Sequence, residues 1–438
     1  MAGNLGMGLF KFGQPRLAAG RRTAQGLRVS TLMLAGLLLG ASSAGAQNLT
    51  LNEVIERALK FTPAMESASA QQQLGAANVD VARAPLLPNL EYDTEYYQAP
   101  GYSPIITNSG QSDTMLVLTY TAFDGGQRLA RYRAARYASQ AAAMGMAAAR
   151  AQVVFDASLA YYNLLQTSQI ETELKASLHR LDQYVTIVIA LQRNGRAIVS
   201  DVLKIQNARN AAELSLVGAR AARQRASVVL GALMGDFDQT DIGIADITAP
   251  PPPPGDDIER NPLLVAAQRR VNAAQQEVTA ARAEAYPTFS LALTSGFLGV
   301  NPPHTVAHNL GASYDGLVTV PIFEGGLIRA HVNQAKARRM AALAQQHQIE
   351  IDLKQRLADA RLRYQQASEE LAMLAHALPT ATNAFALYWT RFLGGGNTTL
   401  LEVLDAYNQA EQMKLSRIQQ VFAQRLASIE GQLIVAQP

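Results

Sequence analysis

The sequence predicts a mostly α-helical chain that adds four β-strands to a transmembrane β-barrel. Three observations indicate this fold class. The sequence contains an internal duplication with a period near 200 residues. Each half has one very long helical stretch, and in each half a pair of short strands precedes that stretch. A long α-helical barrel joined to strands of alternating polarity accommodates all three observations.

Residues 1–46 are expected to be a secretory signal peptide. Four arginines make a basic leader, an apolar run follows over residues 29–41, and Ala44-Gly45-Ala46 has the small-residue pattern of a cleavage site. An N-terminal membrane anchor is the alternative. The apolar run is about 13 residues long, which is short of the roughly 20 that cross a bilayer as a helix.

Charge and cysteine content exclude several functions once the leader is set aside. Removal of its five basic residues leaves 33 of the 38 Lys and Arg against 35 Asp and Glu, a net charge of −2, so no nucleic-acid partner is expected. The chain has no cysteine, which excludes disulfides and thiol chemistry. Residues beyond 46 contain no long apolar segment, so a membrane crossing requires β-strands.

An internal repeat divides the mature chain into two halves. The sequence Phe123-Asp124-Gly125-Gly126 returns 200 residues later as Phe323-Glu324-Gly325-Gly326, and Pro88 returns 199 residues later as Pro287. Gly195 and Asp201 return 201 residues later as Gly396 and Glu402. The predicted organisation is a first repeat at 47–249, a Pro-rich linker at 250–256 and a second repeat at 257–438.

Each repeat has the same predicted order of elements. A helix (about 51–84, then about 257–285) precedes two strands, a long helix (about 127–193, then about 328–392) and a return helix (about 199–233, then about 400–435). At ~1.5 Å per residue each long helix extends on the order of 100 Å, too far for one globular core. Pro379 should kink the second long helix.

The first predicted strand carries the argument for a membrane. Its apolar and aromatic positions alternate with polar ones, namely Leu90, Tyr92, Thr94 and Tyr96 with Asn89, Glu91, Asp93 and Glu95. This pattern is typical of a barrel strand with lipid outside and water inside, so Glu91, Asp93 and Glu95 are expected in the barrel lumen. The third strand alternates more mildly, and the strands at about 112–122 and 310–323 less cleanly. The edge strand of a soluble sheet is the alternative.

The strand number requires an oligomer, because closing a barrel takes about eight strands. Small residues at 141–143 and 147–149 suit close packing between helices, although helix propensity alone also explains them. A non-porous periplasmic coiled-coil scaffold or adaptor protein is the alternative function. It explains the helices but not the two pairs of strands.

With these motifs in this order, the chain resembles the TolC-like family of outer membrane efflux proteins. The resemblance rests on the opening Leu49-Thr50-Leu51-Asn52-Glu53-Val54, the twice-used Phe-acid-Gly-Gly corner and the Gly-x5-acid-Val-Leu turns, and it spans about 49–435. It implies a homotrimer that crosses the outer-membrane lipid and extends into the periplasm. It also implies an exit duct of a tripartite efflux or type I secretion system. Such a duct passes small molecules or proteins from an inner-membrane transporter and a periplasmic adaptor protein.

The resemblance also places a pore constriction at the periplasmic end. Glu402 and Asp405 match acidic residues that narrow the pore in the family, and their spacing puts both carboxylates on one helix face. A trimer would gather these carboxylates around the bore, where they would attract cations. A solvated helix face, with Glu402 serving the helix N-terminus, is the alternative.

The two helix-to-helix turns are the expected docking surface for the adaptor. They are marked by Arg193, Gly195, Asp201 and Gly396. Some members of the family hold the closed pore with a tyrosine and an arginine, where this chain has Leu393 and Thr398. Arg193 or Arg391 could substitute for that latch.

No catalytic or cofactor site is predicted. His304 and His308 lie in a Pro-rich loop without a neighbouring carboxylate, so no metal site is expected there. The acid-Gly-Gly corners lack the spacing and the Gly-Lys-Ser/Thr ending of a phosphate loop. The chain is therefore not expected to be an enzyme, and each corner is expected to be a strand-to-helix turn.

Overall fold

The computed structural model describes residues 49–107, 109–237, 241–245, 252–253, 255, 257–300 and 310–435. The predicted signal peptide, most of the predicted linker, and both His304 and His308 lie outside these residues. The chain divides into two units, Met1–Gly45 and Ala46–Pro438, and the fold below is that of the second unit.

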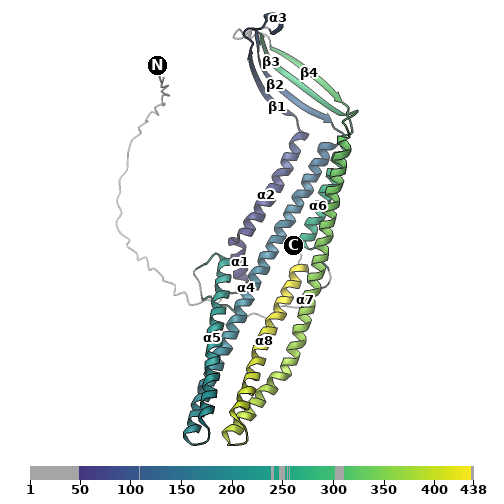
Figure 1. The fold of residues 1–438 in the computed structure, drawn as a ribbon. Helices are drawn as coiled ribbons and strands as arrows, with labels where there is room; N and C mark the ends of the chain where they lie inside the picture. Colours follow the sequence, from purple (N-terminus) through teal and green to yellow (C-terminus); the bar gives the residue numbers. More distant parts are fainter. Residues whose placement is uncertain are drawn as a thin grey trace, which may run out of the picture. The chain divides into compact units, whose positions relative to one another are not determined.

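Long helices and one sheet make up this unit (Figure 1). In chain order the elements are α1 (Leu51–Phe61), α2 (Pro63–Arg83), a 3₁₀ turn (Ala84–Leu86), β1 (Asn89–Gln98), α3 (Pro104–Thr107), β2 (Gly110–Phe123), α4 (Gln127–Arg193), α5 (Val199–Met234), α6 (Pro262–Ala283), β3 (Thr288–Val300), β4 (Leu310–Thr319), α7 (Leu327–Leu393) and α8 (Leu400–Val435).

The predicted long helices are confirmed. α4 and α7 have 67 residues each, and their return helices α5 and α8 have 36 each. α4 contains no proline and ends where Gly195 takes φ +73°, a left-handed conformation that glycine adopts without strain. α7 continues unbroken through Pro379.

Three predicted bounds are corrected. The first helix is not continuous over 51–84 but breaks at Thr62, whose ψ of 122° follows from the steric restriction that Pro63 imposes on its predecessor. α6 starts at Pro262 rather than at 257, because the side chain of Asn261 caps it by accepting from the Leu263 N–H (2.9 Å). β4 ends at Thr319 rather than near 323, because Pro321 has no N–H to extend the ladder.

The four strands form one antiparallel sheet in the order β1-β2-β3-β4. The pairing register inside each half is the same. Leu90 pairs with Leu118 in the first half, and their repeat equivalents Phe289 and Val318 pair in the second. The pairing of β2 with β3 joins the two halves. The duplication in sequence is therefore a duplication in structure.

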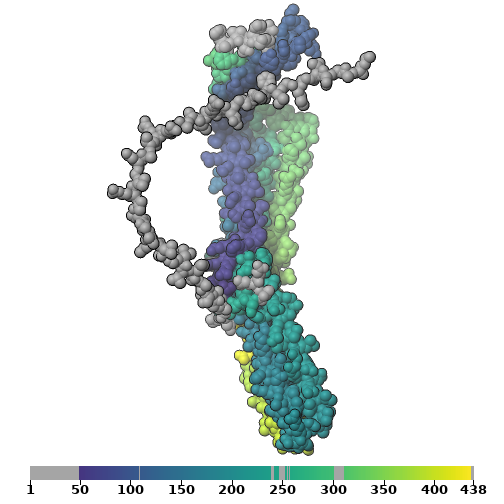
Figure 2. Space-filling view, turned by 90° about the vertical axis from the view of Figure 1, so that its left-hand side faces the viewer, coloured from purple at the N-terminus to yellow at the C-terminus, as the bar shows by residue number. Residues whose placement is uncertain are grey.

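The helices pack as two hairpins that extend from the sheet. α4 packs against α5 and α7 against α8, while α4 also contacts α2, α6 and α8. Figure 2 views the α4–α5 hairpin (teal) from its own side, where it hides all but an edge of α8 (yellow). Apolar side chains form separate clusters along the hairpins rather than one globular core.

One cluster fixes the first described residues, including α1, to the middle of α4. Val54 and Ala58 of α1 are fully buried with Tyr161 of α4. The single proton of the Tyr161 hydroxyl is shared between two carbonyl oxygens, that of Ala245 at 2.5 Å and that of Leu49 at 3.0 Å. This phenol therefore ties together two chain segments that are distant in the sequence.

The two acid-Gly-Gly corners are strand-to-helix turns, as predicted. Gly125 and Gly126 have φ of +63° and +85°, and Gly325 and Gly326 have +60° and +87°. In the first corner the Asp124 carboxylate accepts from the backbone N–H of Gly126 (3.1 Å) and from that of Arg128 (2.9 Å). The acid therefore satisfies free N–H groups at the start of α4.

Substitution of Gly296 by alanine should destabilise the sheet. A Cβ at this position of β3 would lie 2.1 Å from the Thr114 carbonyl oxygen and 2.7 Å from the Met115 Cα, which are backbone atoms of β2. We expect Gly296→Ala to lower the free energy of unfolding by about 1–3 kcal/mol, measured by guanidinium unfolding.

Gly311 provides the matched control for this experiment. It pairs with Gly296 in the sheet, but a Cβ there meets nothing within 4 Å. Gly311→Ala should leave the unfolding free energy unchanged or raise it slightly. Equal destabilisation by the two variants would contradict the explanation by backbone contact.

Candidate functional site

The sheet has one acidic face. Glu91, Asp93 and Glu95, the predicted lumen residues, lie on the same face of β1 as the side chains of Asp113 and Asp315 on β2 and β4. Glu95 and Asp113 are direct partners across β1 and β2, and the Asp113 carboxylate accepts from the Glu95 N–H (3.1 Å). The structure therefore adds two acids that the sequence analysis did not assign to this face.

The opposite face of the sheet is apolar. Leu90, Leu118, Leu293 and Tyr314 stand in one row across all four strands, because each is the register partner of the next. Three of them are well exposed in the isolated chain, Leu90 by 64%, Leu293 by 46% and Tyr314 by 86%. An exposed apolar face opposite an acidic face is the pattern of a sheet between lipid and water.

The two helix-to-helix turns have the same geometry, with one correction to the predicted equivalence. After Gly195 the Arg196 N–H donates to the Leu191 carbonyl (2.8 Å), and after Gly395 the Gly396 N–H donates to the Arg391 carbonyl (3.0 Å). Gly395 has φ +77°, so it is Gly395, not Gly396, that takes the place of Gly195. The second turn is one residue longer, which explains why the offset changes to 201 beyond it.

The two turns contact each other. The guanidinium of Arg196 donates to the Leu393 carbonyl oxygen at the end of α7. The residues predicted for a latch in this region were Arg193 and Arg391, whereas the only sequence signal for Arg196 was its place inside the turn. Arg193 and Arg391 are exposed at the ends of α4 and α7.

Apolar side chains surround the turns. They are the exposed residues Ile198 (65%), Val199 (63%), Leu203 (62%) and Leu401 (55%). Exposed aliphatic side chains grouped at the end of a helical hairpin are a surface on which a partner can bury apolar area.

Glu402 and Asp405 share the exposed face of the first turns of α8, as predicted. The Glu402 carboxylate accepts from the Thr399 N–H (2.7 Å) and hydroxyl (3.1 Å), and the Thr399 hydroxyl accepts from the Glu402 N–H (3.3 Å). This is a capping box, so Glu402 does serve the start of the helix. Its role in a constriction needs neighbouring copies of the chain and stays a prediction.

Asp201 has the same local role at the start of α5. Its carboxylate accepts from the Ile198 N–H (3.3 Å) and lies 3.7 Å from the Lys204 ammonium group. The structure gives that role to Asp201 itself.

Polar contacts hold the two hairpins together above the turns. The Tyr407 hydroxyl of α8 donates to the Ser177 carbonyl of α4 (3.1 Å) and lies 2.6 Å from the Ser177 hydroxyl. Arg180 contacts Glu173 (2.8 Å) and Glu411 (2.8 Å), and Lys414 contacts Glu173 (3.1 Å) and Glu411 (2.9 Å). Each of these ionic groups is partly buried, and the four charges balance.

Aromatic rings continue this junction towards the turns. The Tyr184 ring of α4 lies 4.5 Å from Trp389, 5.7 Å from Phe385 and 6.0 Å from Tyr407, measured between ring centroids. The tilted and edge-on geometries are those that aromatic pairs prefer. None of these residues was predicted, because their proximity depends on pairing two helices more than 200 residues apart.

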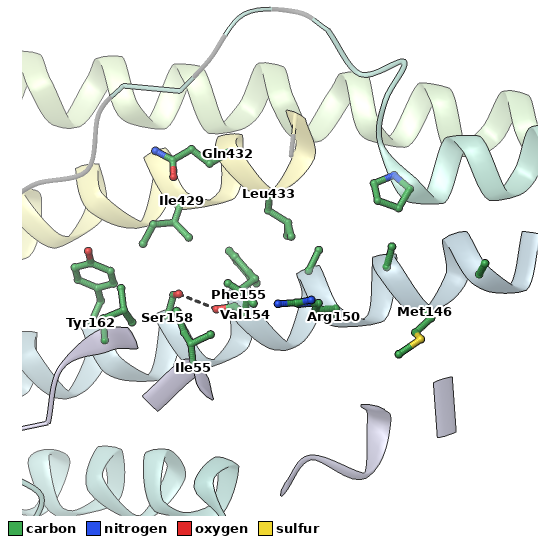
Figure 3. Close-up of a pocket in the computed structure, with 15 residues that line it drawn as sticks. Ile55, Met146, Arg150, Val154, Phe155, Ser158, Tyr162, Ile429, Gln432 and Leu433 are labelled. Carbon is green, nitrogen blue, oxygen red and sulfur yellow. Dashed lines mark hydrogen bonds between the residues drawn. The ribbon is translucent and has the colours of Figure 1, made fainter. Parts of the chain in front are cut away.

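A hollow of about 850 Å³ lies beside α4, where α8 ends and α6 begins (Figure 3). Ile55, Val154, Phe155 and Ile429 are among its mostly apolar lining. The Ser158 hydroxyl donates to the Val154 carbonyl (2.7 Å), so it is not held by a general base. The residues that line the hollow include no Asp, Glu or His.

Two further features are absent from the part of the chain that the structure describes. There, no group of three or more His, Asp or Glu side chains could hold a metal ion. No helix in the same residues is both long and apolar enough to cross a membrane.

Known proteins share this sequence pattern and this fold. Protein CyaE of Bordetella pertussis is 26% identical over 347 residues, which cover 74% of this chain and 72% of CyaE. Outer membrane protein TolC of Escherichia coli is 22% identical over 416 residues, covering 88% and 82%. The crystal structure of VceC from Vibrio cholerae matches with a TM-score of 0.77 at 22% identity, covering 87% of this chain and 95% of VceC.

The fold is the one shared by channels that combine a helical barrel with a β-barrel. The family description "outer membrane efflux protein" matches residues 54–236 and 254–430, and the chain belongs to that family. The predicted resemblance, fold class and outer-membrane location are confirmed. Because the family consists of structural channels, the chain is not an enzyme.

Acidification should loosen the junction between the hairpins. Burial acts to raise the pKa of Glu173, but hydrogen bonds from Arg180 and Lys414 outweigh it and hold this pKa below its ordinary value. A carboxylate with a lowered pKa in the folded protein stabilises the fold at every pH above the ordinary glutamate pKa of about 4.3. This stabilisation is lost as the pH falls below about 4.3 and through the lower pKa that the group has in the folded protein. We therefore expect the melting temperature to fall from about pH 6 to pH 3.

Glu173→Gln should reduce that fall, measured by circular dichroism of the mature protein. Glu66→Gln is the matched control, because Glu66 is exposed on α2, away from this network. The control should keep the pH dependence of the wild type. A Glu173→Gln variant with an unchanged pH dependence would show that this carboxylate does not contribute to it.

Proposed function

We propose that this chain forms a homotrimeric channel that serves as the passive exit duct of a tripartite export system. The observation that supports this most is the sheet, which has one apolar face, one acidic face and an edge strand on each side. Within the described strands, β1 and β4 each pair on one side only. Three such sheets joined edge to edge would close one barrel with the acidic face inside.

The repeat provides the register for joining neighbouring chains. Within the chain, Leu118 of β2 faces Leu293 of β3. The repeat equivalent of Leu118 is Val318 of β4, 200 residues later, and that of Leu293 is Thr94 of β1, 199 residues earlier. The same pairing between chains would therefore place Val318 of one copy opposite Thr94 of a neighbouring copy. Both belong to the apolar face, so the faces would match across the junction as they do inside the chain.

A disulfide between neighbouring copies should test this register. The natural chain has no cysteine, so a Val318→Cys/Thr94→Cys variant carries only the introduced thiols. Opposed residues of an antiparallel pair have Cα atoms about 4.5–5.5 Å apart, within the range that a disulfide bridges. We expect covalent dimers and trimers, and no larger ladder, on non-reducing gels.

Val318→Cys/Leu90→Cys is the matched control. Leu90 lies on the same face of β1 but four residues from Thr94, about 13 Å along the strand. This variant should stay monomeric on the gel. Equal cross-linking by both variants, or a ladder beyond three chains, would argue against a closed trimer in this register.

At the other end of the molecule, we propose that the turns dock an adaptor protein and, through it, an inner-membrane transporter. Arg193, Gly195, Asp201 and Gly396 lie in or beside these turns, next to the exposed aliphatic side chains described above. The duct would take small molecules or proteins from the pump. The pump would supply the energy.

Glu402 and Asp405 would form the constriction of the channel. Their shared exposed face on α8 supports this role, since a trimer would bring three copies of it together. The capping box does not conflict with it, because a capping carboxylate keeps its negative charge.

Ion conductance in a planar lipid bilayer should test the constriction. A Glu402→Gln/Asp405→Asn variant removes both charges, and the amide oxygen introduced at position 402 can still accept from Thr399. We expect small cation-selective steps from the wild type, with larger and less selective steps from the variant. Asp201→Asn, on the other hairpin, should change selectivity much less.

Two outcomes would revise the proposal. If the variant conducts as the wild type does, the channel stands and the two carboxylates are only helix surface. If a folded, detergent-solubilised trimer does not conduct, or if the mature protein is a soluble trimer without detergent, the chain is a periplasmic scaffold or adaptor instead.

A further inference from the structure

The two stretches of the chain that form the sheet contain no basic residues. Residues 84–127 and 283–328 contain no Lys or Arg, yet each stretch is flanked by arginine, with Arg83 and Arg128 around the first and Arg282 and Arg329 around the second. Each stretch holds two strands and their connection. Positive charge therefore begins where the chain leaves the sheet for the helices.

The helix-side end of the sheet carries a band of exposed aromatic and aliphatic side chains. It comprises Leu87 (55%), Phe123 (53%), Tyr286 (56%), Val320 (52%), Ile322 (94%) and Phe323 (87%). Aromatic residues concentrate in this way at the boundary between the hydrocarbon core and the headgroups of a membrane. Because the strands cross the outer membrane, this band marks its periplasmic boundary.

Besides Arg131, six exposed basic side chains lie just on the helix side of the band, and we call these six the cationic collar. They are Arg83, Arg133, Arg136, Arg282, Arg329 and Lys336. Arg136 and Lys336 are the tenth residues of their helices, so at ~1.5 Å per residue the collar lies within about 15 Å of the corners.

The acids of this region do not neutralise the collar. Asp124 is paired with Arg128 (2.8 Å), and Glu284 with His331 (2.8 Å) and Arg131 (3.5 Å). Among the described residues, no collar side chain has a hydrogen bond or an ion pair, and Arg136 only lies over the Tyr132 ring (5.9 Å). Asp80, Glu277 and Glu324 are the remaining acids nearby, three against six basic residues, so the collar keeps a net positive charge.

Both halves of the chain contribute to the collar at equivalent positions. Arg83 returns as Arg282 at the offset of 199 residues, and Arg136 returns as Lys336 at the offset of 200. Two halves that differ at most positions have thus kept basic residues at the same level. In an oligomer the equivalent positions would recur around the whole circumference.

We propose that the cationic collar binds the anionic phospholipid headgroups of the periplasmic leaflet. Charge complementarity identifies the partner, since unpaired arginine and lysine side chains directly below an aromatic belt lie at the level of phosphate groups. The collar fixes the depth of the strands in the membrane and so the height of the hairpins in the periplasm. This role depends on the outer-membrane location and not on the exported substrate or on trimer closure.

Lipid binding by the purified mature chain tests the proposal. The delipidated protein in dodecyl maltoside is mixed with equal amounts of phosphatidylglycerol and phosphatidylcholine of the same acyl chains, and bound lipid is counted by native mass spectrometry. We expect the wild type to prefer phosphatidylglycerol, and this preference to shrink as salt is raised. Each neutralised collar residue should lower phosphatidylglycerol binding about fivefold, as expected for one basic residue near an anionic surface.

Two double variants make the comparison specific. Arg136→Gln/Lys336→Gln removes one equivalent pair of the collar, and these exposed side chains hold no contact on which the fold depends. Lys60→Gln/Arg417→Gln removes the same two kinds of charge from exposed sites on α1 and α8, away from the sheet. The collar variant should lose the preference for phosphatidylglycerol, and the control should keep it.

Equal binding of the two lipids by the wild type, or an unchanged lipid preference in the collar variant, would overturn the proposal. If the variant with an unchanged preference also changes anion permeability in a planar bilayer, these residues lie in the aqueous bore. The wild-type salt dependence is informative even if a variant fails to fold.

Discussion

The antiparallel pairing of β2 with β3 is the interaction on which the rest of the structure depends. It joins the two repeats edge to edge, and because α4 follows β2 and α6 precedes β3, the same pairing brings those helices into contact. It also aligns the faces of the sheet, since side chains alternate along each strand and a slip of one residue would turn every side chain to the other face. The apolar row from Leu90 to Tyr314 exists only in this register.

Further from the sheet, specific side-chain contacts replace strand pairing. The hairpins meet through the Tyr407–Ser177 hydrogen bonds, the Arg180 ion network and the ring of Tyr184. These groups are partly buried and their charges balance, although the Arg180 Nε–H has no hydrogen-bond partner among the described residues. Their fixed donor and acceptor geometry defines one arrangement of the hairpins more sharply than apolar packing alone would. At the turns, the contact through Arg196 is an exposed one.

Much of the fold could be predicted from the sequence because its signals are local. The long helices follow from the scarcity of proline and glycine, and the turns from Gly195 and its counterpart. The break at Thr62 was also signalled by Pro63, but the helical pattern on both sides outweighed it in the prediction. The position of Asp315 on the acidic face was not accessible, because β4 alternates poorly and takes its face from β3. The Arg180–Glu411 pair joins residues 231 positions apart, which no local pattern reveals.

The matched lengths of the helices limit how such a chain can change over evolutionary time. α4 and α7 both have 67 residues, so the two hairpins descend equally far from the sheet. Deleting one residue from α4 alone would raise its tip by about 1.5 Å and turn everything below by about 100°. Insertions and deletions can therefore persist only when they change both long helices by whole turns. The lengths of α5 and α8 must then change by the same amount. Turns and loops between elements escape this restriction, as the extra residue before α8 shows.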